Sequence, residues 1–294
     1  MIIDELNHIG SALASRIREL GYTSPSLADL ICESLGAQSL WRNVGIDEIY
    51  DEIFACESLP PQHIPSGIFG DPPVIVYLSE DHKFYIELLF HFKMSMDIHD
   101  HGFTGAFVVL SGECANQIFD FKTEHSLPVS FGILDRKSTE CLRMGDIRPI
   151  RNGMQFIHRN LHLDKPTVTL VARTASDNVA QHTYYAPGLS VESNVSGVER
   201  RQLELIRSLL RTDTERARAY VERLIAGKIR SNQAYRILDL ISKSNFPDSY
   251  VANVLEKASP TFKELTQEVW KSLSMTEDLD VELARILIAR RSTE

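Results

Sequence analysis

Two histidines, His99 and His101, stand one residue apart in the stretch MDIHDHGFTGAFVVLSGEC, residues 96–114. β-forming residues and a glycine turn follow them, which predicts that the pair lies on a strand. Side chains alternate along a strand, so both imidazoles project to one side and can hold a single ion, whereas Asp100 points the other way. Imidazole nitrogen suits Fe, Zn, Cu or Ni near neutral pH. The pair therefore predicts two ligands of a metal site.

A third ligand must come from elsewhere, and the stretch NGMQFIHRNLHLDKPTVTLVAR, residues 152–173, offers one. His158 stands before a turn-and-strand unit, and His162 follows four residues later. Two surface histidines are the ordinary explanation of an isolated HxH pair. The context favours ligands here, because a glycine turn, a later histidine and a further strand follow the pair.

These two stretches resemble the motifs of the cupin superfamily. The first motif of that family is HxH with a nearby glutamate and a glycine turn; here it reads HDHGFTGAFVVLSG. The second has a glycine, a histidine, an asparagine and often a proline, and the comparable residues here are Gly153, His158, His162 and Pro166. The resemblance implies that His99, His101 and His158 are metal ligands. It makes His162, which stands where asparagine is usual, either a residue that supports a ligand from behind or an alternative ligand.

The first motif lacks the glutamate ligand, since Gly105 or Ala106 occupies its place. A three-histidine site without a carboxylate resembles the thiol-dioxygenase branch of cupins, whose best-known member is cysteine dioxygenase. The resemblance covers about residues 84–175 and implies Fe(II), with Zn, Ni or Mn as alternatives, and O2 as co-substrate. That branch carries a Ser-x-His-x-Tyr relay on the next strand, where this chain has Thr169, Val171 and Arg173. Free cysteine is therefore not the expected substrate.

Three neutral ligands leave an iron ion with its full positive charge and with open positions. A small anionic or chelating molecule is the substrate class that we expect. Arg173 shares strand parity with Thr169, so both could face the barrel interior, where a guanidinium would hold a carboxylate or phosphonate. A surface arginine at a strand end is the alternative. Arg159 directly follows a ligand and is expected to point outward in a structural role.

Tyr85 and His91 are further candidates for substrate binding. In FYIELLFHF they share one strand face with Glu87, opposite the apolar set Phe84, Ile86, Leu88, Phe90 and Phe92. If the apolar set packs under flanking helices, Tyr85 and His91 face the metal.

The rest of the chain must position these residues, and it divides into three predicted segments. Residues 1–58 have helical periodicity, residues 67–190 contain short β-rich runs separated by turns, and residues 195–294 have helical periodicity again. The expected fold class is α+β, with a central cupin (jelly-roll) β-barrel flanked by N-terminal helices and a C-terminal helical bundle. The helical segments carry no chemical motif. Three roles stay open for them, namely capping the barrel mouth, building a homodimer and recognising a larger partner, and the sequence does not choose among these.

Composition limits the function classes. With 40 acidic and 31 basic residues, the net charge of −9 argues against nucleic acid and against an anionic membrane surface as partners. No apolar run is long enough to span a bilayer, the N-terminus lacks the features of a signal peptide, and the four cysteines have no CxxC spacing. We therefore expect a cytoplasmic protein with free thiols.

The leading hypothesis is a mononuclear, non-haem Fe(II)-dependent dioxygenase of cupin fold, an oxidoreductase acting on a small metal-chelating anion. Two alternatives stay open. Three histidines also form the zinc sites of hydrolases and hydratases. A cupin that senses or binds a ligand without turnover is the other, and the rewritten strand with Thr169, Val171 and Arg173 keeps it open.

Overall fold

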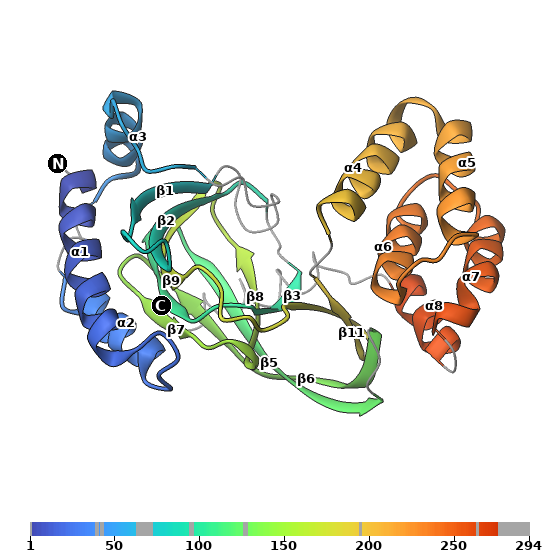
Figure 1. Ribbon diagram of the computed structural model, residues 1–294, viewed down its shortest axis with the longest axis horizontal. Coiled ribbons are helices and arrows are strands. Elements are labelled where there is room, and N and C mark those ends of the chain that lie inside the picture. Colours follow the sequence, from blue (N-terminus) through green and yellow to red (C-terminus); the bar gives the residue numbers. More distant parts are fainter. Residues whose placement is uncertain are drawn as a thin grey trace, which may run out of the picture. The chain divides into compact units, whose positions relative to one another are not determined.

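A computed structural model describes residues 2–38, 41, 44–62, 73–93, 97–125, 129–193, 196–262 and 265–275. These residues form eight helices and eleven strands (Figure 1). They divide into two compact units. The first contains the described residues up to Phe119 and Arg136–Val179, and the second contains Asp120–Asp135 and the described residues from Ala180 onward.

A five-stranded antiparallel sheet forms one wall of the first unit. Its strand order is β1 (Pro73–Leu78), β2 (Phe84–His91), β9 (Thr167–Thr174), β4 (Gly105–Ser111) and β7 (Ile147–Ile150). Strand alternation gives this sheet two different faces. Phe84, Ile86 and Leu88 of β2 belong to an apolar core on one face, whereas Glu87, Leu89 and His91 line a cavity on the other.

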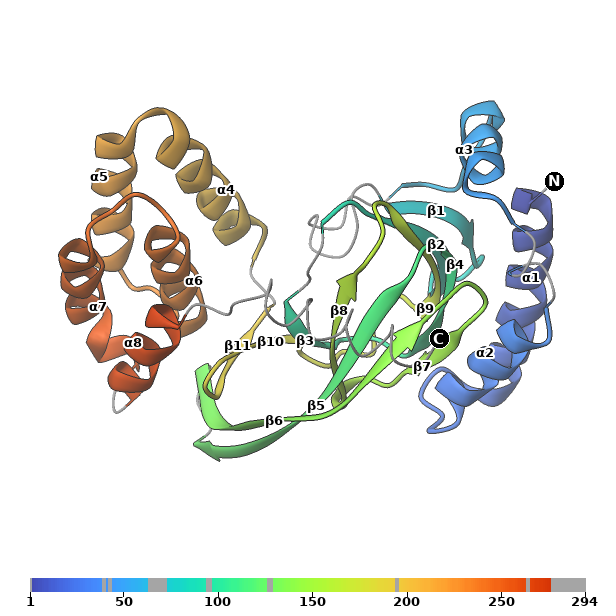
Figure 2. The ribbon, with the colours of Figure 1, turned by 180° about the vertical axis from the view of Figure 1, so that it is seen from behind.

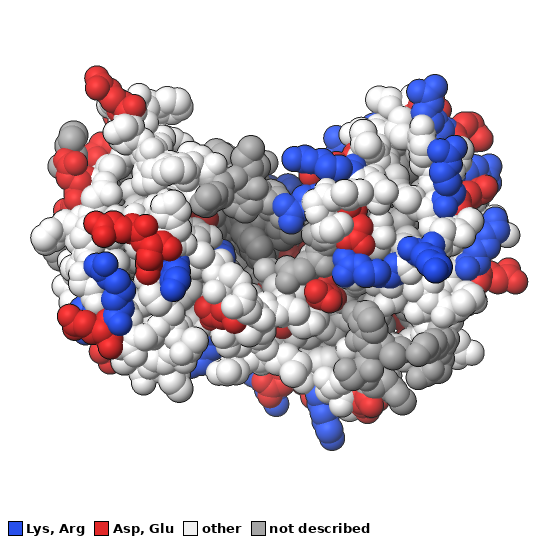
Figure 3. Space-filling model, viewed as in Figure 1, with Lys and Arg blue, Asp and Glu red and all other residues white. Residues whose placement is uncertain are grey.

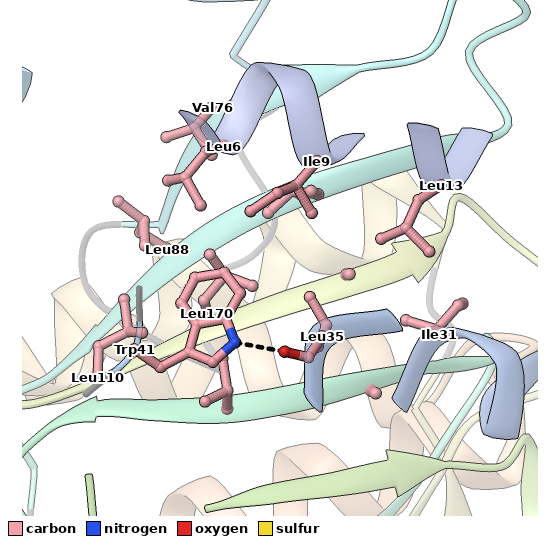
Figure 4. Close-up of a cluster of buried hydrophobic side chains, with 14 of the residues drawn as sticks. Leu6, Ile9, Leu13, Ile31, Leu35, Trp41, Val76, Leu88, Leu110 and Leu170 are labelled. Carbon is pink, nitrogen blue, oxygen red and sulfur yellow. Dashed lines mark hydrogen bonds between the residues drawn. The ribbon is translucent and has the colours of Figure 1, made fainter. Parts of the chain in front are cut away.

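Three N-terminal helices supply the other half of that apolar core: α1 (Ile2–Leu20), α2 (Leu27–Gly36) and α3 (Ile46–Ala55). Leu6, Ile9 and Leu13 repeat at helical spacing on α1 and face the strands, while Trp41 donates a hydrogen bond from Nε1 to the Leu35 carbonyl at 2.7 Å (Figure 4). Figure 2 shows these helices against the outside of the sheet.

α1 also approaches β1 closely, because a Cβ atom on Gly10 would lie 2.3 Å from the Tyr77 ring. The helices of the predicted segment 1–58 thus share one core and one compact unit with the sheet. The apolar set of β2 packs under these helices, which is one of the two arrangements that the sequence left open, except Phe92, which follows the strand and is exposed.

The second sheet has the order β10 (His182–Tyr185), β11 (Leu189–Glu192), β6 (Val129–Leu142), β5 (Cys114–His125), β8 (Gly153–His162) and β3 (Ile98–His101). The predicted glycine turn lies between β4 and β5, where Gly112 has a φ of +77° that L side chains rarely adopt. Residues of β3 and β8 face residues of the first sheet across the cavity. Two antiparallel sheets around a central cavity confirm the predicted α+β jelly-roll class.

The second unit contains β10, β11 and the adjoining parts of β5 and β6, together with five helices: α4 (Gly197–Thr212), α5 (Thr214–Ile225), α6 (Ser231–Ser242), α7 (Asp248–Phe262) and α8 (Thr266–Ser274). Val129, Leu189 and Val191 of the strands share an apolar core with the helices. This unit therefore includes strands that the sequence placed with the barrel. The last part of the predicted helical segment 195–294, from residue 276 onward, lies outside the described residues.

The surface helices bear charges of both signs, and Figure 3 shows acidic and basic side chains interspersed on the visible face. Several are paired along a helix, as in Arg218 with Glu222 and Lys243 with Asp239. Among the described residues, no helix combines the length and apolar character needed to cross a membrane.

Candidate metal centre

Three histidines that are far apart in the sequence meet inside the first unit. His99 and His101 project from β3, and His158 projects from β8 at the position directly opposite His99. Their ligand nitrogens all lie within 4.8 Å of one another, and each residue is 4% exposed. The Nε2 atoms of His101 and His158 are 3.0 Å apart. The structure thus brings together the three residues for which the sequence predicts a metal site.

Burial keeps these imidazoles neutral. It lowers the pKa of His99 from its ordinary value, although nearby carboxylates and the Asp97 carbonyl oppose the shift. The pKa values of His101 and His158 lie well below the ordinary value, because of burial first and then because of the neighbouring imidazoles. A neutral imidazole has a lone pair available for a metal, so the cluster is ready to bind one at neutral pH.

Hydrogen bonds at the Nδ1 atoms orient two of the three rings. His158 Nδ1 lies 2.9 Å from Asn116 Oδ1, and His99 Nδ1 lies 2.8 Å from the Asp97 carbonyl oxygen. Both oxygens are acceptors, so each Nδ1 carries the proton and each Nε2 keeps its lone pair. Metal-binding histidines are commonly held by such partners, which fix both the tautomer and the direction of the ring.

The support of His158 continues to the barrel surface. The Asn116 amide nitrogen donates to Glu140 Oε1 at 2.9 Å, and Arg148 donates to both oxygens of Glu140 at 2.8 and 2.6 Å. The Arg148 hydrogen bonds hold the pKa of Glu140 below its ordinary value. Because these residues come from β5, β6 and β7, their meeting depends on strand register, and sequence reasoning missed them.

The separation of His101 and His158 fits two ligands of one first-row metal ion. Two nitrogens about 2.1 Å from one ion and at a right angle to each other lie about 3.0 Å apart, and the His101–His158 separation is 3.0 Å. Within the described parts of the chain, no Asp, Glu or Cys joins the three histidines in a ligand group. A donor set of neutral imidazoles suits Fe, Zn, Cu or Ni.

The cluster opens into a cavity of about 40 Å³. At about 10–15 Å³ per water, that is room for roughly three water molecules. Its walls come from both sheets and from the segments that connect their strands: Glu87, Leu89, His91, His99, His101, Phe103, Phe107, Ile150, His158, Asn160, Thr169, Val171 and Arg173. Only a small ligand fits beside the histidines.

Arg173 lies in this cavity, on the inward face of β9 with Thr169 and Val171. Its guanidinium stacks 3.4 Å from the centre of the Phe103 ring and lies 3.5 Å from Glu87 Oε1. It also donates to the carbonyls of Thr174 and Ala175. These contacts leave one N–H on each terminal nitrogen without a partner among the described residues, so Arg173 keeps two donors for an anion.

The carboxyl group of Glu87 is buried beside Arg173. Burial raises its pKa, whereas the charge and hydrogen bond of Arg173 oppose that shift. Tyr85 does not line the cavity; its ring lies 5.0 Å from the Arg173 guanidinium, and burial raises its pKa to about 12. The tyrosine proposed for substrate contact therefore contacts the arginine instead.

The other inward candidates lie further along the barrel. His91 lines the cavity, and its Nε2 is 3.0 Å from the Thr169 hydroxyl. His162 is buried and stacks on His91 with ring centres 4.1 Å apart, and it is not in the three-histidine group. Neither of its ring nitrogens has a hydrogen-bond partner in the described part of the protein. The structure thus sets His162 beside His91 rather than among the clustered ligand atoms.

Two polar residues near the site differ from the expectation: Arg159 points elsewhere than predicted, and Asn160 was not predicted at all. Arg159 was expected to point outward, but it is 6% exposed and donates to Gln117 Oε1 at 2.9 and 2.7 Å. The opposite face of β8 is itself covered, so pointing away from His158 does not lead to solvent. Asn160 lines the cavity and was not singled out, although its position two residues after His158 places it on the same strand face.

No protein-family model matches the sequence, and no curated protein matches it. Among solved structures, the chain is similar to a hydroquinone 1,2-dioxygenase in complex with Cd2+ and 4-hydroxybenzonitrile, at 14% identity and a TM-score of 0.27 over 35% of this chain and 63% of that one. It is similar to the DMSP lyase DddQ from Ruegeria pomeroyi at 13% identity and a TM-score of 0.31, over 60% of this chain and 95% of the other.

A third similar structure is a cupin-2 domain protein from Shewanella frigidimarina, with 12% identity and a TM-score of 0.25 over 46% of this chain and 97% of that one. At these identities and TM-scores, the similarity carries no argument about this chain, whose architecture rests on its own strand order and register. The comparisons leave the reaction of this chain open.

Proposed function

We propose that this protein is a metal-dependent cupin enzyme, and specifically an Fe(II)-dependent dioxygenase acting on a small metal-chelating anion. One observation carries the proposal: three neutral, buried histidines converge on a cavity that also contains an arginine with two unused donors. An Fe(II) ion held by such ligands supplies redox chemistry with O2 and keeps positions open for a substrate.

The chain's own residues account for binding and orientation. Arg173 directs two N–H groups at an anionic group, and its planar fork favours a carboxylate. Phe103 fixes the guanidinium by stacking, and Tyr85 contacts the same group from β2. Leu89, Phe107 and Val171 give the space beside the histidines an apolar wall. The small cavity selects for small molecules.

The test is metal analysis of protein purified without chelators, followed by oxygen uptake with a panel of small carboxylic acids. We expect one iron per chain and uptake with a subset of the acids. The His158→Ala variant should lose both while keeping its helical signal in circular dichroism. A folded protein that binds no first-row metal would contradict the proposal.

The same three ligands support a second function, because a three-histidine site also binds zinc and activates water for hydrolysis or hydration. Dependence on oxygen and on iron distinguishes the zinc enzyme from the dioxygenase. A zinc enzyme turns over its substrate without oxygen, and iron reconstitution does not increase its rate. Tight ligand binding with no turnover under either condition would instead support a sensing protein.

A further inference from the structure

The cavity that contains the histidine cluster has a polar side chain at each end of the stretch of β9 that lines it. Thr169 and Arg173 both face inward on β9, and four residues of strand separate their Cα atoms by about 13 Å. Leu89 is the register partner of Thr169, and Tyr85 is that of Arg173, so β2 spans the same length. The Arg173 end carries the charge. The Thr169 end carries His91, and Asn160 lies on the inward face of β8 between His158 and His162, the residue that stacks on His91.

Asn160 is the unusual group at this second end. It is 6% exposed and lines the cavity, its Oδ1 atom is fully buried, and its amide makes no hydrogen bond to a described residue. Asn116, its register partner on β5, uses its own amide to bond His158 and Glu140. An amide buried without a partner is unfavourable, and such groups in native structures usually mark a bound molecule or a function.

The neighbouring groups define what could bind there. The Thr169 hydroxyl is 3.0 Å from His91 Nε2, so this pair can accept or donate one further hydrogen bond. Asn160, Thr169 and His91 supply an amide, a hydroxyl and an imidazole, none of which carries a fixed charge. A neutral group that both donates and accepts matches them better than an ammonium or a second carboxylate, whose burial requires an opposite charge.

We infer that Asn160, Thr169 and His91 form a second substrate subsite that binds a neutral hydroxyl group. The substrate is then a small hydroxy acid, with its carboxylate at Arg173 and its hydroxyl at Asn160. This inference rests on the proposed function for the carboxylate end, and it adds the class of molecule that the site accepts. Asn160 is a specificity-determining residue of that site.

The experiment is anaerobic calorimetric titration of the iron-loaded protein and of the metal-free protein with two matched pairs of acids. The pairs are 3-hydroxypropanoate with propanoate and 4-hydroxybutanoate with butanoate. One hydroxyl that satisfies a buried amide should improve affinity about tenfold for at least one pair. Asn160→Leu and the near-isosteric Thr169→Val should each reduce that preference to threefold or less. Asn7→Leu on α1, outside the cavity, should preserve it.

Several outcomes would overturn the inference. These are equal affinities within both pairs, no binding of any of the four acids, or a preference that persists in both cavity variants. The result is separable from the proposed function. If the protein prefers hydroxy acids but binds no iron and takes up no oxygen, the subsite is supported and the dioxygenase function is contradicted. If it takes up oxygen but shows no such preference, the dioxygenase function is supported and the subsite is contradicted.

Discussion

Asn116 on β5 and His158 on β8 are joined by a hydrogen bond of 2.9 Å between Oδ1 and Nδ1. Because the Asn116 amide nitrogen is itself bound to Glu140, the amide cannot turn to present its nitrogen to the ring without losing that contact. The bond therefore sets the tautomer of His158 and directs its Nε2 toward His99 and His101. Asn116 thus contributes to the geometry of the site by fixing the direction of the proposed ligand His158.

The first prediction follows from this contact. Asn116→Ala should weaken metal binding about 10- to 100-fold, the range typical for loss of a partner that orients a metal-binding histidine. The cause is a ring free to rotate and to change tautomer. Competition with a chromogenic chelator measures the affinity. Asn152→Ala, which removes a hydrogen bond to Asp177 of similar length in the same unit, is the matched control and should leave affinity unchanged.

The second prediction distinguishes the proposed ligand His158 from His162, which is not in the three-histidine group. His158→Ala should abolish stoichiometric metal binding. His162→Leu should retain one metal per chain and should be as stable as the wild type or more stable, since it removes two buried nitrogens without partners. Metal content and urea unfolding measure these effects. Loss of metal in His162→Leu would show that His162 is a ligand after all.

The third prediction concerns Arg173. Arg173→Lys keeps the positive charge but loses the planar fork and the stacking on Phe103, so affinity for a carboxylate ligand should fall about tenfold or more. Metal content should not change. Arg151→Lys changes an exposed arginine paired with Asp29 at 2.7 Å and should have no effect on either measurement. An equal loss in both variants would assign the effect to general electrostatics.

The fourth prediction concerns pH. Burial lowers the pKa of His162 from 6.5 to about 4, so between these values the unfolded chain binds a proton that the folded chain does not. The stability of the metal-free protein is then full above pH 6.5 and is lost as pH falls toward 4. In His162→Leu, proton uptake on unfolding across this window should decrease by up to one. Urea unfolding at a series of pH values with chelator present measures it, and an unchanged pH dependence would contradict it.

The sequence predicts those features of the site that depend only on residues close together on one strand. His99 and His101 share a face because strand parity alone requires it, and the same rule places Thr169 and Arg173 in the cavity. Alternation on β2 separated an apolar face from a polar one but did not say which meets the helices; in the structure the apolar residues from Phe84 to Phe90 do.

The missing parts depend on contacts between strands. Asn116, Glu140 and Arg148 meet only because of the registers of β5, β6 and β7, which no single strand encodes. Asn160 could have been found from the sequence, because it lies two residues after His158 and therefore on the same strand face. An amide side chain, however, does not by itself indicate a metal site. The sequence predicts the N-terminal helices as a segment of their own, residues 1–58, but their apolar faces require a partner, and the sheet supplies it.

The fifth prediction tests that shared core. Ile17 on α1 is fully buried, and Ile17→Ala should lower the free energy of unfolding by about 2–5 kcal/mol, because the cavity left behind cannot close completely. Ser15→Ala on the exposed face of α1 should change it by less than about 0.5 kcal/mol. Since α1 and the sheet that bears Arg173 form one core, unfolding of α1, monitored by hydrogen exchange of its amides, and release of metal should occur at the same urea concentration. Unfolding of α1 at a lower concentration than metal release would mean that the N-terminal helices fold as a domain of their own.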